Sequence, residues 1–547
     1  MWIDFRVRDR WGGLPPRTNF LTLTFPRLLG REGRGIALGS YVSIAAVALA
    51  SLTLAGCMVG PDFVVPALPL TAGFTPGGKL PETDSAPVDN GEAQKFLKGR
   101  DIPGDWWRVF HSRQLDKLVA DALLANPSLE AAQATLWQAQ ETLYAQAGVL
   151  LPSIDGNASA TRQQFSPATF GQSGKPILFN LFQTSVNVSY SPDLFGGKRR
   201  QIESNEAQVD YQRFELEATY LTLTANVVTA AIQEFSLRGQ IEATEEIIKA
   251  QTDQLDLIQQ QFNLGSVART DVLAQQSELA QSQATLPVLQ KQLAQQRHLL
   301  QELTGRFPNE ETPALDVSML RLPTNLPVSL PSRLVEQRPD IRAAEAQLHQ
   351  ASAQVGVAIA NRLPQINLTG EYGSAALSTA TLLTPGSIIW NIGASATQPI
   401  FHGGTLLHQE RAAEAAYEAA AAQYKSTVLM AFQNVADVLK ALQADATALS
   451  AQDKATQAAS DSLELIRSQY RLGSIPYVNL LTAQRTYQQA RLTLVQAQAA
   501  RLADTAALYQ ALGGGWWNRA DVKPDPFTPE GHFIDVRAST TTAGRPQ

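Results

Sequence analysis

The sequence reads FNLGSVARTDVLAQQ over residues 262–276 and YRLGSIPYVNLLTAQ over residues 470–484. Each stretch holds the triplet LGS within a segment rich in helix-forming residues, and glycine readily adopts the left-handed conformation that ends an α-helix. No proline occurs between residues 197 and 264 or between residues 405 and 472. The pattern predicts two very long helices, each followed by a tight turn and a returning helix, and these two hairpins set the architecture of the chain.

The returning helices are expected over residues 267–303 and 478–512, with the hairpin tips at Gly265 and Gly473. At about 1.5 Å per residue, each outgoing helix would extend roughly 100 Å, which is several times the thickness of a bilayer core. These helices also contain too many Gln, Glu and Arg residues to cross a membrane. We therefore expect helical hairpins that stand in water and pack on each other.

Other landmarks recur in the same order in both halves of the chain. The matched positions are Pro152 and Pro364, Gly196–Gly197 and Gly403–Gly404, and Gly265 and Gly473. A bias towards alanine and glutamine can imitate helical similarity, but it cannot place these prolines and glycines in register. We interpret the body of the chain as two tandem repeats over 105–320 and 321–517. A linker rich in Pro, Gly and Ala over 57–104 precedes them, and a tail over 518–547 follows.

Four segments near the matched prolines change from a helical period to a period of two. The predicted strands cover about 153–163, 181–191, 365–374 and 389–399. Such alternation suits a soluble antiparallel sheet, and it equally suits outer-membrane strands with lipid on one face and a polar lumen on the other. Four membrane strands cannot close a barrel, so closure would need copies from other subunits. A dimer would supply eight strands and a trimer twelve, and the trimer leaves the wider aqueous lumen.

The only cysteine follows the longest apolar run of the chain. Residues 36–54 are apolar, arginines precede them, and LAGC ends at Cys57, which is a layout typical of a signal peptide. LAGC is similar to a bacterial lipobox, in which the cysteine thiol is acylated and the cysteine becomes the new N-terminus. We therefore predict a signal peptide over 1–56 and a lipid anchor at Cys57. An uncleaved membrane helix or an ordinary buried thiol are the alternatives.

Composition argues against several other classes of function. The net charge is −6 and the charges are interspersed, so no basic patch is available for nucleic acid. One cysteine can form neither an intramolecular disulfide nor a multi-cysteine metal site. The six histidines show no metalloprotease pairing, and the chain has no phosphate loop and no nucleophile elbow. We expect no enzymatic activity, no cofactor and no metal.

Taken together, these landmarks resemble those of outer-membrane efflux proteins of the TolC/OprM type, in particular the lipoproteins of NodT-like efflux systems. The segments that carry the resemblance are LAGCMVGPDF, NPSLEAA and RPDIRAAE, FGGKRR and FHGGTL, the two LGS triplets, and YQALGGGW. The resemblance covers about residues 57–517. It implies a mainly α fold with a membrane β-barrel, in which a homotrimer forms a twelve-stranded barrel that continues into a periplasmic tunnel of long helices.

The resemblance also implies a location, a role and partners. The protein would be lipid-anchored in the outer membrane of a Gram-negative bacterium, with a large periplasmic part. It would act as a passive exit duct for small molecules, as in multidrug efflux. An inner-membrane pump of the RND type would supply the energy through a periplasmic adaptor (membrane fusion) protein.

By the same resemblance, the hairpin tips would surround the periplasmic aperture and contact the adaptor. The implied residues are Leu264, Gly265, Ser266 and Asp271 at the first tip, and Leu472, Gly473, Ser474, Val478, Asn479 and Thr482 at the second. Family members often place aspartates where Asn479 and Thr482 stand here, so an acidic constriction is not expected. Asp271 matches an aspartate that ties the closed aperture, although a carboxylate near a helix N-terminus is favourable in any case. Val478 would form an apolar closure ring or a core contact.

Two other functions remain open at this point. A lipoprotein could scaffold an envelope complex without passing solute, or the chain could be the outer-membrane duct of a protein secretion system. A scaffold has no need of alternating strands at both matching positions. The closing ALGGGW and the lipobox favour small-molecule efflux over protein secretion.

Overall fold

The computed structural model describes residues 58–67, 73–75, 80–171, 173–310 and 320–520. The predicted signal peptide over 1–56 and the predicted anchor at Cys57 lie outside these residues, as does most of the C-terminal tail. The chain divides into two compact units, and each takes segments from both halves of the sequence. The first unit contains Ala134–Arg213 and Ala343–Thr427, and the second contains Ala72–Gln133, Phe214–Arg342 and the chain from Val428 onwards.

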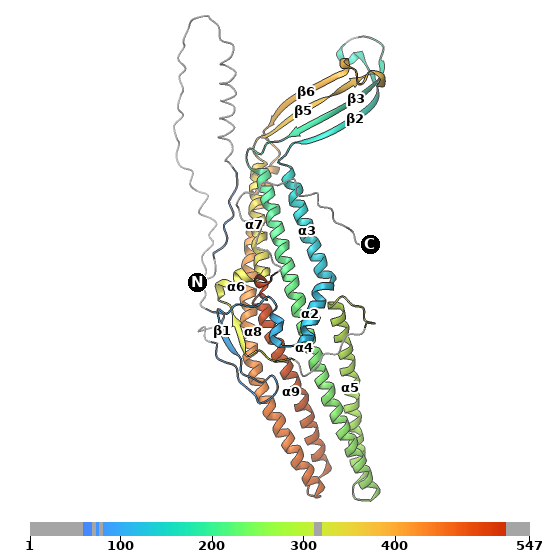
Figure 1. Cartoon of the computed structure of the whole chain (residues 1–547), viewed down its shortest axis with the longest axis vertical. Helices are drawn as coiled ribbons and strands as arrows, with labels where there is room; N and C mark the ends of the chain where they lie inside the picture. The colour runs from blue at the N-terminus through green and yellow to red at the C-terminus, as the bar shows by residue number, and fades with distance from the viewer. Residues whose placement is uncertain (1–57, 68–72, 76–79, 172, 311–319, 521–547) are drawn as a thin grey trace. The chain divides into compact units, whose positions relative to one another are not determined.

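The first unit contains a four-stranded antiparallel sheet, in which the strands lie side by side (Figure 1). The strands are β2 (Ser153–Phe165), β3 (Ile177–Tyr190), β5 (Gln365–Ala376) and β6 (Ile388–Thr397), and they pair in the order β2-β3-β5-β6. All four predicted strands are confirmed to within a few residues. Because β2 and β6 are the outer strands, each has one edge that pairs with no other described strand.

The strand register places polar and apolar side chains on opposite faces of the sheet. Asp155, Asn187, Glu371 and Asn391 lie opposite one another in one row across the four strands. The adjacent rows carry exposed apolar side chains, and Tyr372, Trp390 and Ile392 are 63%, 71% and 81% exposed. Because successive side chains of a strand point to opposite faces, one face of the sheet is polar and the other is apolar and uncovered in this chain.

Helices complete the first unit. It includes most of α3 (Pro127–Gly148) and α7 (Pro339–Ala360), and the first parts of α4 (Gly197–Asn263) and α8 (Thr405–Arg471). Short 3₁₀ turns lie between the paired strands: η3 (Pro167–Phe170) between β2 and β3, and η5 (Thr379–Thr381) and η6 (Pro385–Ser387) between β5 and β6.

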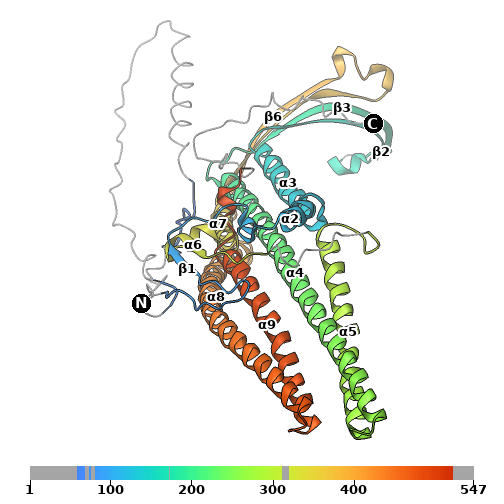
Figure 2. The same cartoon turned by 60° about the horizontal axis from the view of Figure 1, so that its bottom comes forward.

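The second unit contains the two predicted helical hairpins, which Figure 2 shows with their tips turned forward. The remainder of α4 is followed by α5 (Arg269–Leu303), and the remainder of α8 is followed by α9 (Tyr477–Ala511). The outgoing helices both have 67 residues and the returning helices both have 35. The tandem repeat is therefore visible as the same order of helices and strands in both halves. None of the described helices combines the length and the apolar composition that a membrane span requires.

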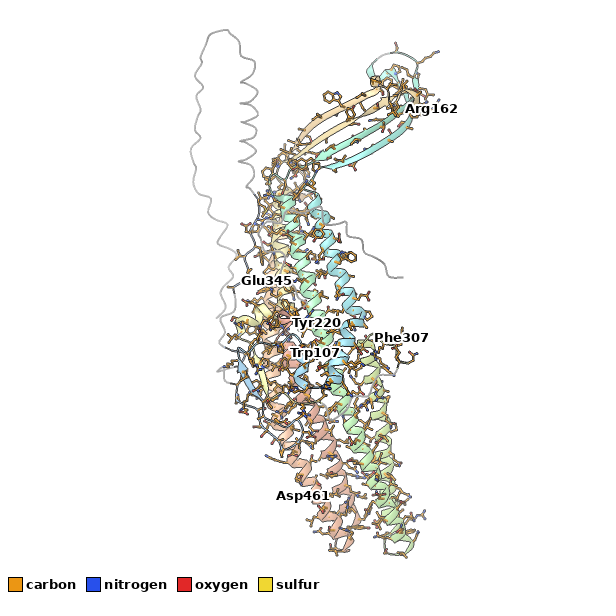
Figure 3. All side chains as sticks on the ribbon, viewed as in Figure 1. Trp107, Arg162, Tyr220, Phe307, Glu345 and Asp461 are labelled. Carbon is orange, nitrogen blue, oxygen red and sulfur yellow. The ribbon has the colours of Figure 1, made fainter. Side chains whose placement is uncertain are left out.

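An apolar core packs the other elements of the second unit against the helices. They are η2 (Trp106–Phe110), α2 (Arg113–Ala125), α6 (Pro331–Gln337) and η7 (Trp516–Asn518). Trp107, labelled in Figure 3, is buried in this core, and the neighbouring Trp106 stacks on Tyr509 with 5.5 Å between ring centroids. Arg519 lies 3.5 Å above the ring of Tyr220, so the chain remains packed just beyond η7.

The structure differs from the prediction within the linker. Residues 57–104 were expected to be irregular, but β1 (Lys95–Lys98) pairs in parallel with β4 (Asn325–Val328). Further contacts hold the preceding segment, because buried Arg501 on α9 donates to the carbonyls of Asn90 and Glu92 at 3.3 and 2.7 Å. A four-residue strand is too short to show a period, and its partner lies far along the chain.

Candidate functional site

Both hairpin tips have the same local structure. Gly265 has φ +77°, and the backbone N–H and hydroxyl of Ser266 both donate to the carbonyl of Gln261, at 2.9 and 2.8 Å. At the second tip Gly473 has φ +72°, and Ser474 makes the same two bonds at 3.1 and 2.8 Å. This is a Schellman-type helix end. A Cβ atom at either glycine would meet nothing within 4 Å, so the backbone conformation alone requires glycine there.

An apolar cluster joins the two hairpins near these tips. Its buried members are Ile258 on α4, Val272 on α5, Leu463 on α8, and Tyr477, Leu480, Leu481 and Ala483 on α9. All four helices contribute to this group, which we call the tip cluster. Burial of these side chains holds the first hairpin against the second.

Two polar contacts tie α5 to α9 beside the tip cluster. The hydroxyl of Tyr477 donates to Gln275 Oε1 at 2.6 Å, and burial raises the pKa of Tyr477 so that it remains a donor. The guanidinium of Arg485 lies 2.5 Å from Glu278 Oε2, and its hydrogen bond to this carboxylate raises the pKa of Arg485. Glu278 is only 4% exposed, so Arg485 compensates a carboxylate that would otherwise be buried without a partner.

The predicted aperture residues lie at the surface of the tips. Leu264, Leu472 and Val478 are exposed, as are the glycine and serine of each LGS triplet. Val478 is 61% exposed and therefore makes no core contact in this chain. Asn479 and Thr482 are also exposed in the first two turns of α9, and Thr482 lies three residues after Asn479 and four after Val478, spacings that make side chains neighbours on a helix. The structure thus brings the predicted residues of the second tip together on one surface.

Asp271 lies in the first turn of α5 and is half-buried. Tyr470 and Tyr477 pack close by, with 5.2 Å between their ring centroids. Burial raises the pKa of Tyr470, and the charge of Asp271 adds to the effect. Within the described residues Asp271 has no ion pair, and a carboxylate is favourable at this place because of the partial positive charge of a helix N-terminus.

Sequence reasoning missed the residues that tie the hairpins together, namely Gln275, Glu278 and Arg485. The signal that could have found them is the placement of Glu278 and Arg485 at nearly the same distance from the two tip glycines. Side chains of opposite charge at matched positions of two repeats indicate that these two side chains contact each other. Among the described residues, no group of His, Cys, Asp and Glu is arranged to hold a metal ion.

The segment that directly follows Cys57 is held by a buried arginine. Arg200 on α4 is 1% exposed, and its Nε donates to the carbonyl of Val59 at 3.0 Å. The same guanidinium contacts Asp62 and Glu203, each at 2.7 Å. We call residues 58–63 the N-terminal strap.

Close packing holds the rest of the strap. Gly60 has φ +93°, and a Cβ atom there would lie 2.4 Å from Cα of Gly356 on α7, so only glycine fits. The ring of Phe63 stacks on His349 at 4.4 Å, and His349 Nε2 lies 3.0 Å from Glu203 Oε1. Burial opposes ionisation of Glu203, but hydrogen bonds from His349 and Arg200 outweigh it and lower its pKa. Gly60 and Phe63 of the N-terminal strap thus have packing roles.

A sheet with an uncovered apolar face, whose two outer edges pair with no described strand, fits one subunit of an oligomeric outer-membrane channel. The chain belongs to the outer membrane efflux protein family, whose family model matches residues 118–306 and 330–514. It is 30% identical over 443 residues to the pyoverdine export outer membrane protein OpmQ of Pseudomonas putida, which covers 80% of this chain and 93% of OpmQ.

Two further comparisons extend over most of the chain. The probable efflux pump outer membrane protein TtgC of Pseudomonas putida is 28% identical over 496 residues, covering 89% of this chain and 99% of TtgC. The solved structure of the outer-membrane channel OprN is 28% identical with a TM-score of 0.74, covering 84% of this chain and all of that chain.

The protein is therefore the outer-membrane channel component of an efflux system. Channels of this family work as trimers together with a periplasmic adaptor and an inner-membrane pump. The trimer accounts for the two unpaired edges of the sheet, because β6 of one subunit can pair with β2 of the next. Lipid anchoring is typical of the family, and it agrees with the lipobox before Cys57.

Proposed function

We propose that this protein is a passive exit duct for small molecules, whose periplasmic aperture is formed by the two hairpin tips. The observation that carries the proposal is the exposed surface of α9 formed by Val478, Asn479 and Thr482, next to the buried tip cluster. Three copies of this surface around a three-fold axis would line a narrow opening. Relatives named for export of pyoverdine and toluene support small organic cargo.

The proposed aperture has no acidic ring. Asn479 and Thr482 are neutral, and the nearest cation on α9, Arg485, is paired with Glu278. Closure would therefore rest on the apolar Val478 and on the ties between α5 and α9. Such an aperture would discriminate less by the charge of the cargo than an acidic ring would, because the α9 residues assigned to its lining are uncharged.

In this proposal the outermost residues of the tips contact the periplasmic adaptor. Leu264, Leu472 and the LGS serines are exposed there, and the two tips have the same backbone structure. A partner with repeated features could therefore engage both tips in the same way. Cys57 is assigned to the lipid anchor, and the N-terminal strap would fix the point at which the acylated N-terminus leaves the protein.

The two alternative functions have weaker support. A scaffold that passes no solute gives no reason for a sheet with an uncovered apolar face carrying Tyr372 and Trp390. A protein secretion duct is disfavoured by relatives named for efflux of small molecules. The proposal includes no catalytic role, in line with relatives that are channel proteins.

A thiol placed at Val478 tests the aperture. Cys57 is the only cysteine and its thiol would be acylated, so Val478→Cys would supply the single free thiol of the mature protein. The purified variant is reconstituted into planar bilayers and treated with a bulky positively charged thiol reagent. We expect conductance to fall at least severalfold, and Val478→Ser with the same reagent to be unaffected. Unchanged conductance of a fully labelled Val478→Cys protein would place the aperture elsewhere.

A further inference from the structure

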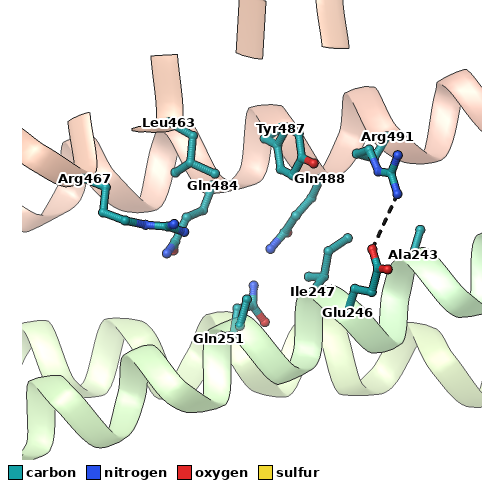
Figure 4. Close-up of a pocket in the computed structure, with 11 residues that line it drawn as sticks. Ala243, Glu246, Ile247, Gln251, Leu463, Arg467, Gln484, Tyr487, Gln488 and Arg491 are labelled. Atoms are coloured by element: carbon teal, nitrogen blue, oxygen red, sulfur yellow. Dashed lines mark hydrogen bonds and ion pairs between the residues drawn. The ribbon is translucent and has the colours of Figure 1, made fainter. Parts of the chain in front are cut away.

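A pocket with both apolar and polar walls lies between the two hairpins, away from the tip surface. It is bounded by α4 of the first hairpin and by α8 and α9 of the second, and its volume is about 200 Å³ (Figure 4). Ile247 and Leu463 supply apolar wall, and Gln251, Gln484 and Gln488 supply amides. The space is large enough for several water molecules or one small organic molecule.

The pocket contains buried amide groups that no described residue satisfies. Gln251 is 1% exposed, and neither its Oε1 nor its Nε2 has a hydrogen-bond partner. Oε1 of Gln484 is buried without a partner as well. Figure 4 shows the Gln251 side chain directed from α4 into the space opposite Gln488. Because buried polar groups in folded proteins are nearly always paired, these atoms indicate a bound polar species.

The charges around the pocket are asymmetric. At one end Arg491 is paired with Glu246 at 3.4 Å. At the other end Arg467 extends beside Gln484 (Figure 4), and within the described residues its guanidinium has no ion pair or hydrogen bond. A guanidinium recognises a carboxylate through parallel hydrogen bonds. The end of the pocket at Arg467 is therefore suited to an anion, next to unpaired amide donors and acceptors.

We propose that this pocket binds a small carboxylic acid that also carries an amide or hydroxyl group. The carboxylate would pair with Arg467, a ligand N–H or O–H would donate to Oε1 of Gln484 or Gln251, and a ligand oxygen would accept from Nε2 of Gln251. The aliphatic part of the ligand would contact Ile247 and Leu463. A bound ligand would touch both hairpins and stabilise their packing against each other.

N-acetylglycine is a suitable probe because it carries a carboxylate, an amide N–H and a carbonyl within the available volume. Isothermal titration calorimetry on the purified full-length protein in detergent should show saturable binding at one site per chain. Acetamide, which lacks the carboxylate, should bind at least tenfold more weakly. No saturable binding of N-acetylglycine, or equal binding of acetamide, would overturn the assignment.

Variants locate the binding to this pocket. Gln251→Leu removes the buried amide and Arg467→Gln removes the cation, and each should weaken binding at least tenfold. Gln260→Leu, at an exposed position of the same helix, should bind as the unmodified protein does. Arg467 is exposed, so its variant remains informative if Gln251→Leu fails to fold. Unchanged binding in either folded pocket variant would contradict the proposal. The readout requires no transport, so it is independent of the proposed aperture.

Discussion

At the residue scale, the tip glycines are required by their backbone conformation. Gly473 has φ +72°, and a Cβ atom added there would meet nothing within 4 Å, so Gly473→Ala should suffer only conformational strain. We expect it to lower the free energy of unfolding by about 1 kcal/mol. Gly148→Ala is the control, because Gly148 lies in α3 with equally open space and no left-handed φ. Chemical denaturation checks both variants, and equal stability of the two would contradict the argument.

A pair of aspartates gives the second unit a specific pH dependence. Asp504 on α9 is half-buried, and burial together with the neighbouring carboxyl of Asp445 on α8 raises the pKa of Asp504 from 3.8 to about 7. The folded chain therefore holds a proton that the unfolded chain has already released between about pH 4 and pH 7. The free energy of unfolding should fall as the pH rises through this interval. Asp445 also lies near the buried Arg501, whose charge it favours.

Asp504→Asn removes this titration while it keeps a hydrogen-bond donor beside Asp445. We expect the variant to melt at a higher temperature than the unmodified protein at pH 8, and at a similar temperature at pH 4. Circular dichroism melting curves across this range provide the measurement. Asp461→Asn, at an exposed aspartate of α8 labelled in Figure 3, should leave the pH dependence unchanged. An identical pH profile for Asp504→Asn would show that the pair does not titrate as argued.

At the element scale, one of the contacts between the hairpins is an ion pair with a buried partner, Glu278 with Arg485. Arg485→Gln leaves the Glu278 carboxylate buried without its counter-charge, which should weaken the packing of α5 on α9 by roughly 2 kcal/mol. We expect a higher conductance in planar bilayers, because the tie that holds the tips together is lost. The double variant Glu278→Gln with Arg485→Gln has no buried charge and should be more stable than Arg485→Gln alone. A double variant less stable than the single one would contradict this reasoning.

At the scale of the whole molecule, the two free edges of the sheet require neighbouring subunits. Native mass spectrometry of protein extracted from membranes should show a trimer whose chains begin at Cys57 and carry acyl groups. Cys57→Ala should still form trimers but without the acyl mass, because strand pairing and not the lipid closes the barrel. Monomers or dimers as the dominant species would leave edges that lipid does not tolerate.

Local sequence signals were enough to predict the four hairpin helices, the four strands of the larger sheet and the order of these elements along the chain. The helix ends at Gly265 and Gly473 and the period of two in the strands are local properties, governed by backbone sterics and by alternating faces. The duplicated spacing of prolines and glycines predicted equal hairpins in both halves. The tip glycines could be named for the same reason, whereas the aperture and adaptor roles of the residues around them were implied by the family resemblance and remain predictions.

How these elements meet could be learned only from the tertiary structure. Pairing of β3 with β5 and of β1 with β4 brings together residues from different halves of the chain. The tie between Glu278 and Arg485 and the strap held by Arg200 likewise join segments separated by long stretches of sequence. Periodicity and turn signals report on neighbours along the chain, whereas these contacts depend on the three-dimensional packing of helices whose surfaces are rich in similar Ala, Gln and Leu residues.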